Sequence, residues 1–169
     1  VAGSGSLSYT WTIGGDKYFG RTVGLTFNEN GPVSWSVRVT SESGGVARTS
    51  GTHQVQNVNP SINFVNISPR PSAEGGKVTF EAQASDPGQD QLNYTWTIAG
   101  NRYPGPSVSL TFGDDKQVSW KLQVTDGDGG VATRGGLHTV KNVDPTIGSV
   151  GIAPQPSVEG QEVTFNANV

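Results

Sequence analysis

Four aspartates have carboxylate groups that could bind a cation. They are Asp86, Asp90, Asp126 and Asp128. The first two follow one strand-like segment and the last two follow another, and such loops emerge at the same end of a β-sandwich. Carboxylate oxygens on flexible loops are the ligands that Ca²⁺ requires. Asp-Pro and Asp-Gly pairs are also good turn formers, so the pattern is compatible with a calcium site and with plain turns.

The two histidines and two recurring glutamates could do acid–base chemistry, but their spacing argues against it. His53 and His138 lie far apart along the chain, and no repeated nucleophile or orienting acid accompanies them. Glu74 and Glu159 have the same spacing and stand in Glu-Gly turns. A glycosidase-like pair needs two carboxylates that face one cleft at close range. We therefore expect no catalytic residues, no enzymatic activity, and histidines that are half-exposed on a sheet.

Aromatic residues could stack on sugars, although core packing is the better interpretation of the tryptophans. The tryptophans are Trp11, Trp35, Trp96 and Trp120. Each is in phase with a row of Leu, Val and Ile, which indicates an inward side chain. Tyr18 and Tyr103 stand in stretches that look irregular, after Gly15 and Gly100, and are predicted to be exposed.

Two sequons could carry N-linked glycans, although so short a motif also arises by chance. They are Asn66-Ile67-Ser68 and Asn93-Tyr94-Thr95. Asn93 is out of phase with its apolar neighbours and should face solvent. Asn66 lies close to a predicted domain junction.

Composition excludes several classes of function. Only 15% of the 169 residues are charged, the net charge is −3, and no Lys/Arg cluster is present, so a nucleic-acid partner is not expected. The absence of cysteine removes thiol catalysis, iron–sulfur clusters and cysteine-ligated zinc. It also means that any sandwich must be held by its core alone, which suits a bacterial or archaeal surface protein. No apolar run reaches the length of a membrane span.

The chain repeats itself with a constant period, which is the spacing from Tyr9 to Tyr94 and from His53 to His138. The segment 9–13 recurs at 94–98, and 57–60 recurs at 142–145. Residues 1–66 match 86–151 at 31 of 66 positions, and 67–84 match 152–169 at 10 of 18, without a gap. Copies this similar share a fold and a strand register, and a period of this length suits one small independent domain.

Period-2 alternation predicts the strands of the middle copy. Its inward rows are Val78-Phe80-Ala82-Ala84, Leu92-Tyr94-Trp96-Ile98, Val108-Leu110-Phe112 and Val118-Trp120-Leu122-Val124. A strand near 62–67 precedes them, and an extended segment at 131–143, interrupted at Gly135-Gly136, follows. No window has helical periodicity. The predicted fold is all-β, a tandem array of immunoglobulin-like antiparallel β-sandwich repeats.

The middle copy resembles the polycystic-kidney-disease (PKD) type of Ig-like domain. The resemblance rests on the segments Val78–Phe80, Asp86–Asp90, Tyr94–Trp96 and Leu122–Gly130. It implies an extracellular spacer or adhesion module, often in tandem, that contacts proteins or glycans. The family's usual Trp-Asp-Phe-Gly-Asp-Gly is replaced here by the residues 96–100, which leaves other bacterial Ig-like families open.

The repeat predicts three segments: a first repeat at 1–66 without its two opening strands, a complete repeat at 67–151, and two opening strands at 152–169. The last segment should pack in a head-to-tail joint on the first repeat of another copy. The joint is covalent in a longer array, or it is a donated strand pair between separate chains. The predicted contacts join Val163, Phe165, Ala167 and Val169 to Leu7, Trp11, Leu25 and Trp35.

The leading hypothesis is a structural module of an extracellular or cell-surface stalk or filament. Asp144-Pro145 supports it, because proline leaves little freedom for a hinge between domains. The alternative is an adhesion module that binds a glycan or a protein through its end loops. The expected partners are further copies of the chain and glycans, and the one cofactor left open is calcium.

Overall fold

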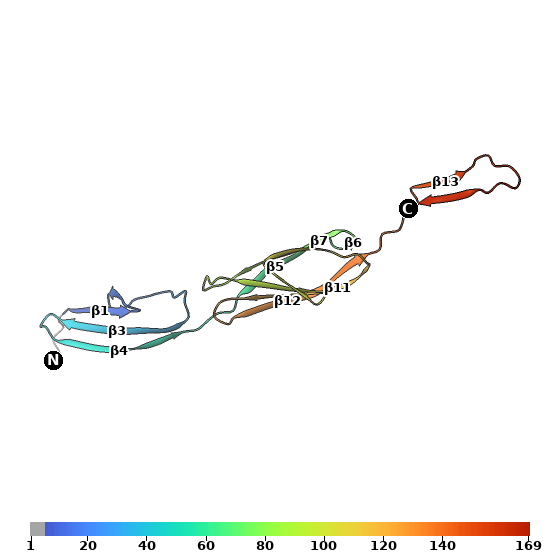
Figure 1. Cartoon of the computed structure of the whole chain (residues 1–169). Coiled ribbons are helices and arrows are strands. Elements are labelled where there is room, and N and C mark those ends of the chain that lie inside the picture. Colours follow the sequence, from blue (N-terminus) through green and yellow to red (C-terminus); the bar gives the residue numbers. More distant parts are fainter. Residues whose placement is uncertain (1–5) are drawn as a thin grey trace.

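The computed structural model describes residues 6–169 and forms three β-units in chain order (Figure 1). The first five residues of the first predicted repeat lie outside the described residues. The described part contains strands and no helix, so the all-β prediction is confirmed. It accordingly offers no helix with the length and apolar character of a membrane span.

The first unit is a single antiparallel sheet in the order β2-β1-β3-β4. Its strands are β1 (Leu7–Ile13), β2 (Asp16–Phe19), β3 (Gly31–Ser41) and β4 (Val46–Val55). The turn between β1 and β2 uses Gly14 and Gly15, both at positive φ, which glycine adopts without steric cost. Trp11 lies opposite both Tyr18 and Val37, so these side chains share one face of the sheet.

The middle unit is a two-layer Ig-like β-sandwich. Its strands are β5 (Ser61–Ser68), β6 (Ser72–Ala73), β7 (Lys77–Ser85), β8 (Asn93–Ile98), β9 (Asn101–Pro104), β10 (Ser107–Thr111), β11 (Lys116–Thr125) and β12 (Val131–Lys141). One layer has the order β10-β7-β5 and the other β6-β12-β11-β8-β9. The four sheet strands of the first unit correspond, one repeat period further along the chain, to β8, β9, β11 and β12 of this second layer.

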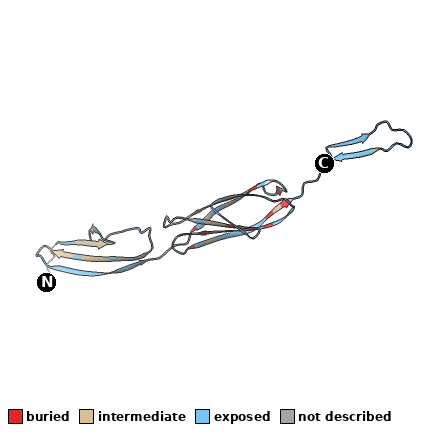
Figure 2. Cartoon of the chain, viewed as in Figure 1, coloured by how far each residue is buried: buried red, intermediate tan, exposed pale blue. Residues whose placement is uncertain are grey.

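The predicted inward rows form the core of the middle unit. Buried residues include Val78, Phe80, Ala82, Trp96, Ile98, Phe112, Val118, Trp120, Leu122 and Val124. Ala84, Leu92, Tyr94, Val108 and Leu110 are partly buried against them. Figure 2 shows buried residues gathered in the middle unit, because only there does a second layer cover the apolar face.

Two predictions of irregular backbone are wrong. The segment after Gly135-Gly136 does not break, because β12 runs through both glycines. A Cβ at Gly136 would stand 3.0 Å from Cζ2 of Trp120, so glycine there makes room for the indole within a continuous strand. The stretches after Gly15 and Gly100 are the short strands β2 and β9, and Tyr103 lies opposite Trp96 and packs on the core.

The first strands of the middle and third units begin before the predicted boundaries at 67 and 152. Strand β5 begins at Ser61 and pairs with β7 of the middle sandwich. The first strand of the third unit begins at Ser149. Sequence identity marks the period of a repeat, whereas strand pairing decides which unit a residue joins.

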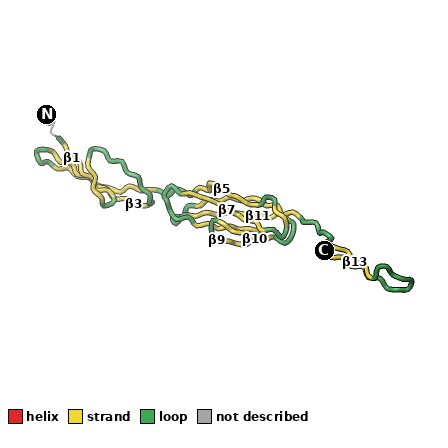
Figure 3. The backbone as a smooth tube through the Cα atoms, turned by 90° about the horizontal axis from the view of Figure 1, so that it is seen from above, coloured by secondary structure: helices red, strands yellow, loops and turns green. Residues whose placement is uncertain are grey.

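The third unit is a two-stranded antiparallel hairpin of β13 (Ser149–Ala153) and β14 (Thr164–Asn168), visible as a separate ladder in Figure 3. Ile152 lies opposite Phe165, and Val150 opposite Ala167. One repeat period earlier, the matching pairs are Ile67 with Phe80 and Val65 with Ala82 in the β5–β7 ladder. The hairpin therefore has the register of the opening strand pair of the sandwich.

Candidate functional site

An apolar groove lies on one face of the first sheet. It has a volume of about 430 Å³ and is lined by Trp11, Ile13, Val23, Leu25, Phe27, Val33, Trp35 and His53. Every lining residue corresponds, one repeat period further along, to a residue of identical type in the middle unit. There the counterparts are buried or packed against the core. The groove is therefore half of a sandwich core with no second layer over it.

The aromatic side chains in the groove already have the arrangement of the complete core. The ring centroids of Trp11 and Trp35 are 6.1 Å apart at 51°, and those of Trp96 and Trp120 are 5.9 Å apart at 53°. Phe27 and His53 are 6.2 Å apart at 36°, and their counterparts Phe112 and His138 are 6.4 Å apart at 37°. The open sheet thus holds its aromatic side chains in nearly the same arrangement as the covered core of the middle unit.

The hairpin exposes the other half of such a core. Phe165 is 71% exposed, whereas its counterpart Phe80 is completely buried against Trp96 and His138. Val150, Ile152 and Val169 are exposed as well, and Val163 is half-buried. Of the predicted groove contacts, Trp11, Leu25 and Trp35 line the groove. Leu7 is exposed beyond it, as expected from its counterpart Leu92, at the margin of the middle core.

One segment of the first unit depends on the missing layer. Residues 22–26 have the alternating pattern of β10 but do not form a strand. In the middle unit β10 pairs with β7 alone in its sheet, with Leu110 opposite Val78. No counterpart of β7 pairs with 22–26 among the described residues, so its backbone groups lack the ladder that would make it a strand.

His138 is fully buried, so the prediction that both histidines are half-exposed is wrong. Its Nε2 lies 2.9 Å from Oγ of Ser72, which belongs to the short strand β6. Burial lowers the pKa of His138, and the positive charge of Arg70 lowers it further. His53, at the equivalent position of the first unit, is exposed in the groove. The two histidines differ because the opposite layer is present over only one of them.

Asp126 organises the loop at the junction of the first and middle units. Its Oδ1 accepts the backbone N–H groups of Asp128 and Gly130 at 2.9 and 2.7 Å. Its Oδ2 accepts a hydrogen bond of 3.0 Å from Nδ2 of Asn57, in the segment between the two units. The bond from Asn57 is the main reason why the pKa of Asp126 is lowered. The sequence did not predict this hydrogen bond between Asn57 and Asp126, although the recurrence of Asn57 as Asn142 could have indicated a role for the asparagine.

The remaining predicted calcium ligands lie around the same junction. Asp86 Oδ1 accepts the N–H of Gly88 at 2.7 Å, and its Oδ2 is buried without a hydrogen-bond partner. Partial desolvation and the charges of Asp128, Asp86, Glu29 and Asp126 raise the pKa of Asp90. A bound cation would relieve the repulsion among these carboxylates. The hydrogen bonds of Asp126 within its own turn, however, explain its position without a cation. Calcium binding by the four aspartates stays a prediction.

Chelation tests the calcium prediction. If the four aspartates bind Ca²⁺, removal of the ion should lower the melting temperature of the middle unit by mass action. Replacement of Asp90 by Asn should abolish the response, whereas the same change at Asp16, in β2 of the first sheet, should leave it intact. Calorimetry with and without chelator measures it, and a melting temperature indifferent to calcium would leave only the turn interpretation.

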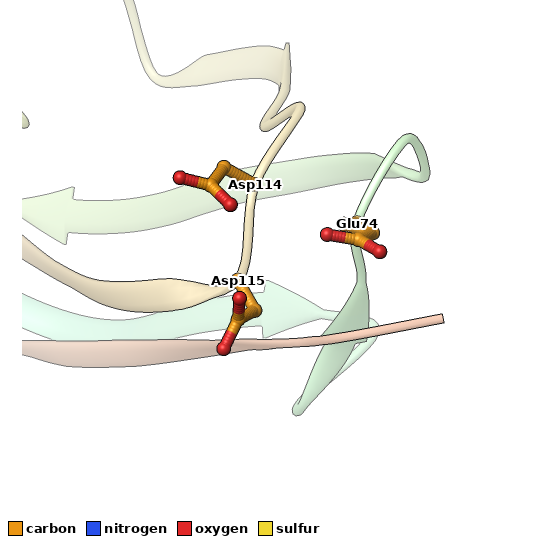
Figure 4. Close-up of side chains that lie close together, drawn as sticks. All are labelled: Glu74, Asp114 and Asp115. Atoms are coloured by element: carbon orange, nitrogen blue, oxygen red, sulfur yellow. The ribbon is translucent and has the colours of Figure 1, made fainter. Parts of the chain in front are cut away.

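A different acidic group lies at the far end of the middle unit. Within residues 6–169, Glu74, Asp114 and Asp115 form the only group of three potential metal ligands (His, Cys, Asp or Glu) whose ligand atoms lie within 4.8 Å of one another (Figure 4). Both aspartates are exposed, and Oε1 of Glu74 accepts the N–H of Val143 at 2.8 Å. Glu74 therefore has a structural task, the anchoring of the chain that leaves β12.

The structure also places the tryptophans, the tyrosines and the two sequon asparagines that the sequence singled out. Trp96 and Trp120 are buried, which confirms them as core, and Trp11 and Trp35 are half-buried in the groove. Tyr18 and Tyr103 are half-buried, so their predicted exposure is wrong, because each lies opposite an inward tryptophan. In the β1–β2 pair, Phe19 is an exposed aromatic residue, with 74% of its surface accessible. Asn66 and Asn93 are both exposed, and their glycosylation stays a prediction.

No protein-family model matches the chain, and no curated protein sequence matches it.

Solved structures similar to the chain are modules of bacterial proteins. The PKD1 domain of Vibrio anguillarum Epp is 21% identical, with a TM-score of 0.44 over 52% of this chain and 100% of that one. Fibronectin(III)-like modules of Clostridium thermocellum CbhA are 11% identical, with a TM-score of 0.42 over 84% and 82%. A 1.5-MDa bacterial ice-binding adhesin is 18% identical, with a TM-score of 0.40 over 92% and 59%. The PKD type is thus both the sequence resemblance and the type of the first of these neighbours.

Proposed function

We propose that this chain is a non-catalytic structural module of an extracellular filament or stalk, built by packing a β13–β14 hairpin over the open groove of a first unit. The observation that carries the proposal is the division of one core into two exposed halves. The groove repeats one layer of the middle sandwich, and the hairpin repeats the strand pair that covers that layer.

The middle unit is the template for the apolar contacts of this joint. Phe80 packs edge-on to Trp96, with ring centroids 5.8 Å apart, and also contacts His138. Transferred by one repeat period, Phe165 would pack on Trp11 and His53. Ile152, Val163 and Ala167 would likewise take the buried places of Ile67, Val78 and Ala82. Burial of such side chains contributes about 1.5–3 kcal/mol each.

The template also supplies polar contacts that would set the register. Glu74 N–H donates to Lys141 O at 2.9 Å, and Gly75 N–H donates to Phe112 O at 2.8 Å. The matching donors on the hairpin side are Glu159 and Gly160, and the matching acceptors are Gln56 and Phe27. Glu159 would also accept the N–H of Val58, as Glu74 accepts that of Val143. Directional bonds of this kind oppose a slip of the hairpin along the groove.

The covering hairpin has two sources with the same chemistry. It could precede the first unit in one longer polypeptide, or it could come from a second copy of the chain. A head-to-tail contact of either kind does not close on itself, so it propagates into a fibre. The mass of the intact protein isolated from its source separates them, because the 169-residue chain has a mass of 17.7 kDa and a continuous array is much heavier.

Self-association of the 169-residue chain tests the proposal. Sedimentation velocity over a range of micromolar concentrations should show the mean size rising with concentration, and electron microscopy should show unbranched fibres. A variant without residues 149–169 should remain monomeric, because it keeps the groove but lacks the hairpin. A folded full chain that stays monomeric at the highest concentration would contradict the proposal.

Binding of a glycan or protein through the end loops stays a prediction. The junction loops that carry Asn57 and Asp126 bond to each other, which supports a structural task for this end of the middle unit.

A further inference from the structure

The buried His138–Ser72 pair shows what happens to this histidine position when the second layer is in place. The imidazole is fully buried between the rings of Phe80 and Phe112, whose centroids are 5.9 and 6.4 Å from it. Its Nε2 shares a hydrogen bond with Ser72, and its Nδ1 is buried with no partner. A neutral imidazole can leave Nδ1 as an unprotonated acceptor, whereas a protonated one would bury a charge and an unsatisfied N–H.

No acid stands by to stabilise the protonated ring. The charged residues of the strands that pack around it are Lys77, Glu81, Lys116, Lys121, Arg134 and Lys141, and all are exposed. Burial lowers the pKa of His138, and the positive charge of Arg70 lowers it in the same direction. The complete sandwich therefore accepts this histidine only in its neutral form.

The first unit presents the same histidine before the second layer arrives. His53 is exposed, and the other residues that line its groove are all apolar. One repeat period beyond Ser72 and Arg70, the hairpin segment supplies Ser157 and Gln155 in their places. Glu159 matches Glu74, whose carboxylate accepts the N–H of Val143 and is not among the groups that shift the pKa of His138. Glu162 takes the place of the exposed Lys77 and is itself exposed, so a docked hairpin would bury His53 beside Ser157, without the nearby cation.

We propose that His53 and Ser157 form a buried pair across the head-to-tail joint, and that this pair makes assembly depend on pH. The proposal rests on the function proposed above. Docking requires neutral His53, so the joint weakens as the pH falls through the range in which histidine side chains take up a proton, around pH 6.5. Below that range docking must expel a proton, and the association constant falls by up to about tenfold for each pH unit. Acid would then dissociate the filament at its head-to-tail joints.

Sedimentation of the full chain at about pH 8 and about pH 5 tests this inference. The wild-type chain should associate at the higher pH. At the lower pH, a concentration at least about tenfold higher should be needed for the same degree of association. The double variant H53F/S157A replaces the pair by apolar groups of suitable size and should associate equally at both. Near-ultraviolet circular dichroism checks that the middle unit stays folded at the lower pH, because protonation of its own buried His138 would also destabilise it.

The outcomes separate the two proposals. Failure to associate at about pH 8 would overturn strand complementation itself. Equal association of the wild-type chain at both pH values would overturn the role of His53 and leave complementation standing. Equal loss of association on acidification in the wild type and in H53F/S157A would assign the pH dependence to other groups, and would also overturn the inference.

Discussion

Replacement of Trp96 with alanine is expected to unfold the middle sandwich. Trp96 is completely buried and packs against both Phe80 and Trp120. Loss of a buried aromatic of this size costs about 3–5 kcal/mol, a large part of the roughly 5–15 kcal/mol that stabilises a small domain. Calorimetric melting of the full chain measures the change, and an unaltered transition would mean that Trp96 contributes nothing to the core.

Trp11 is the matched control for this experiment. It holds the equivalent position in the first sheet and contacts Trp35 at nearly the same ring distance, but it is only half-buried. Its Nε1 donates to Gly20 O at 3.2 Å, so the indole also holds the β1–β2 hairpin. W11A should destabilise a non-associated chain much less than W96A, because no opposite layer encloses the cavity that it leaves. Comparable losses would indicate that the groove is covered in the isolated chain.

Replacement of Phe165 with glutamate is expected to abolish self-association and to leave the chain folded. The ring is 71% exposed in the isolated chain, so the substitution disturbs no core there. In the proposed joint it would place an unpaired carboxylate where Phe80 is buried in the template, which costs several kcal/mol and lowers the association constant by a thousandfold or more. Sedimentation measures the association, and circular dichroism checks the fold.

Asn166 gives this prediction a control of equal charge. It is the next residue of β14, so its side chain points to the other face of the hairpin. Its counterpart in the middle unit is already an acid, Glu81, which is exposed. N166E should therefore associate like the wild-type chain. If N166E fails as F165E does, added charge and not the apolar face controls association; if both variants associate, the hairpin does not occupy the groove.

Alternation and repetition along the chain predict which side chains form the core and where the repeat recurs. Period-2 alternation assigns Val78, Phe80 and Trp96 to the inward face, and burial confirms them. This works because successive side chains of a strand point to opposite faces whatever the strand pairs with. The constant repeat period likewise predicts identical pairing, and β13–β14 repeats the register of β5–β7.

The burial and pairing of residues that face a second layer could be assigned from the packed structure alone. His53 and His138 occupy equivalent strand positions, yet one is exposed and the other is buried beside Ser72. Residues 22–26 have the pattern of β10 but lack its partner strand, so they form no strand. Burial, pKa and even strand formation at these positions depend on contacts with distant segments. Local sequence specifies a face, but only the packed layer opposite decides whether that face is a core or a groove.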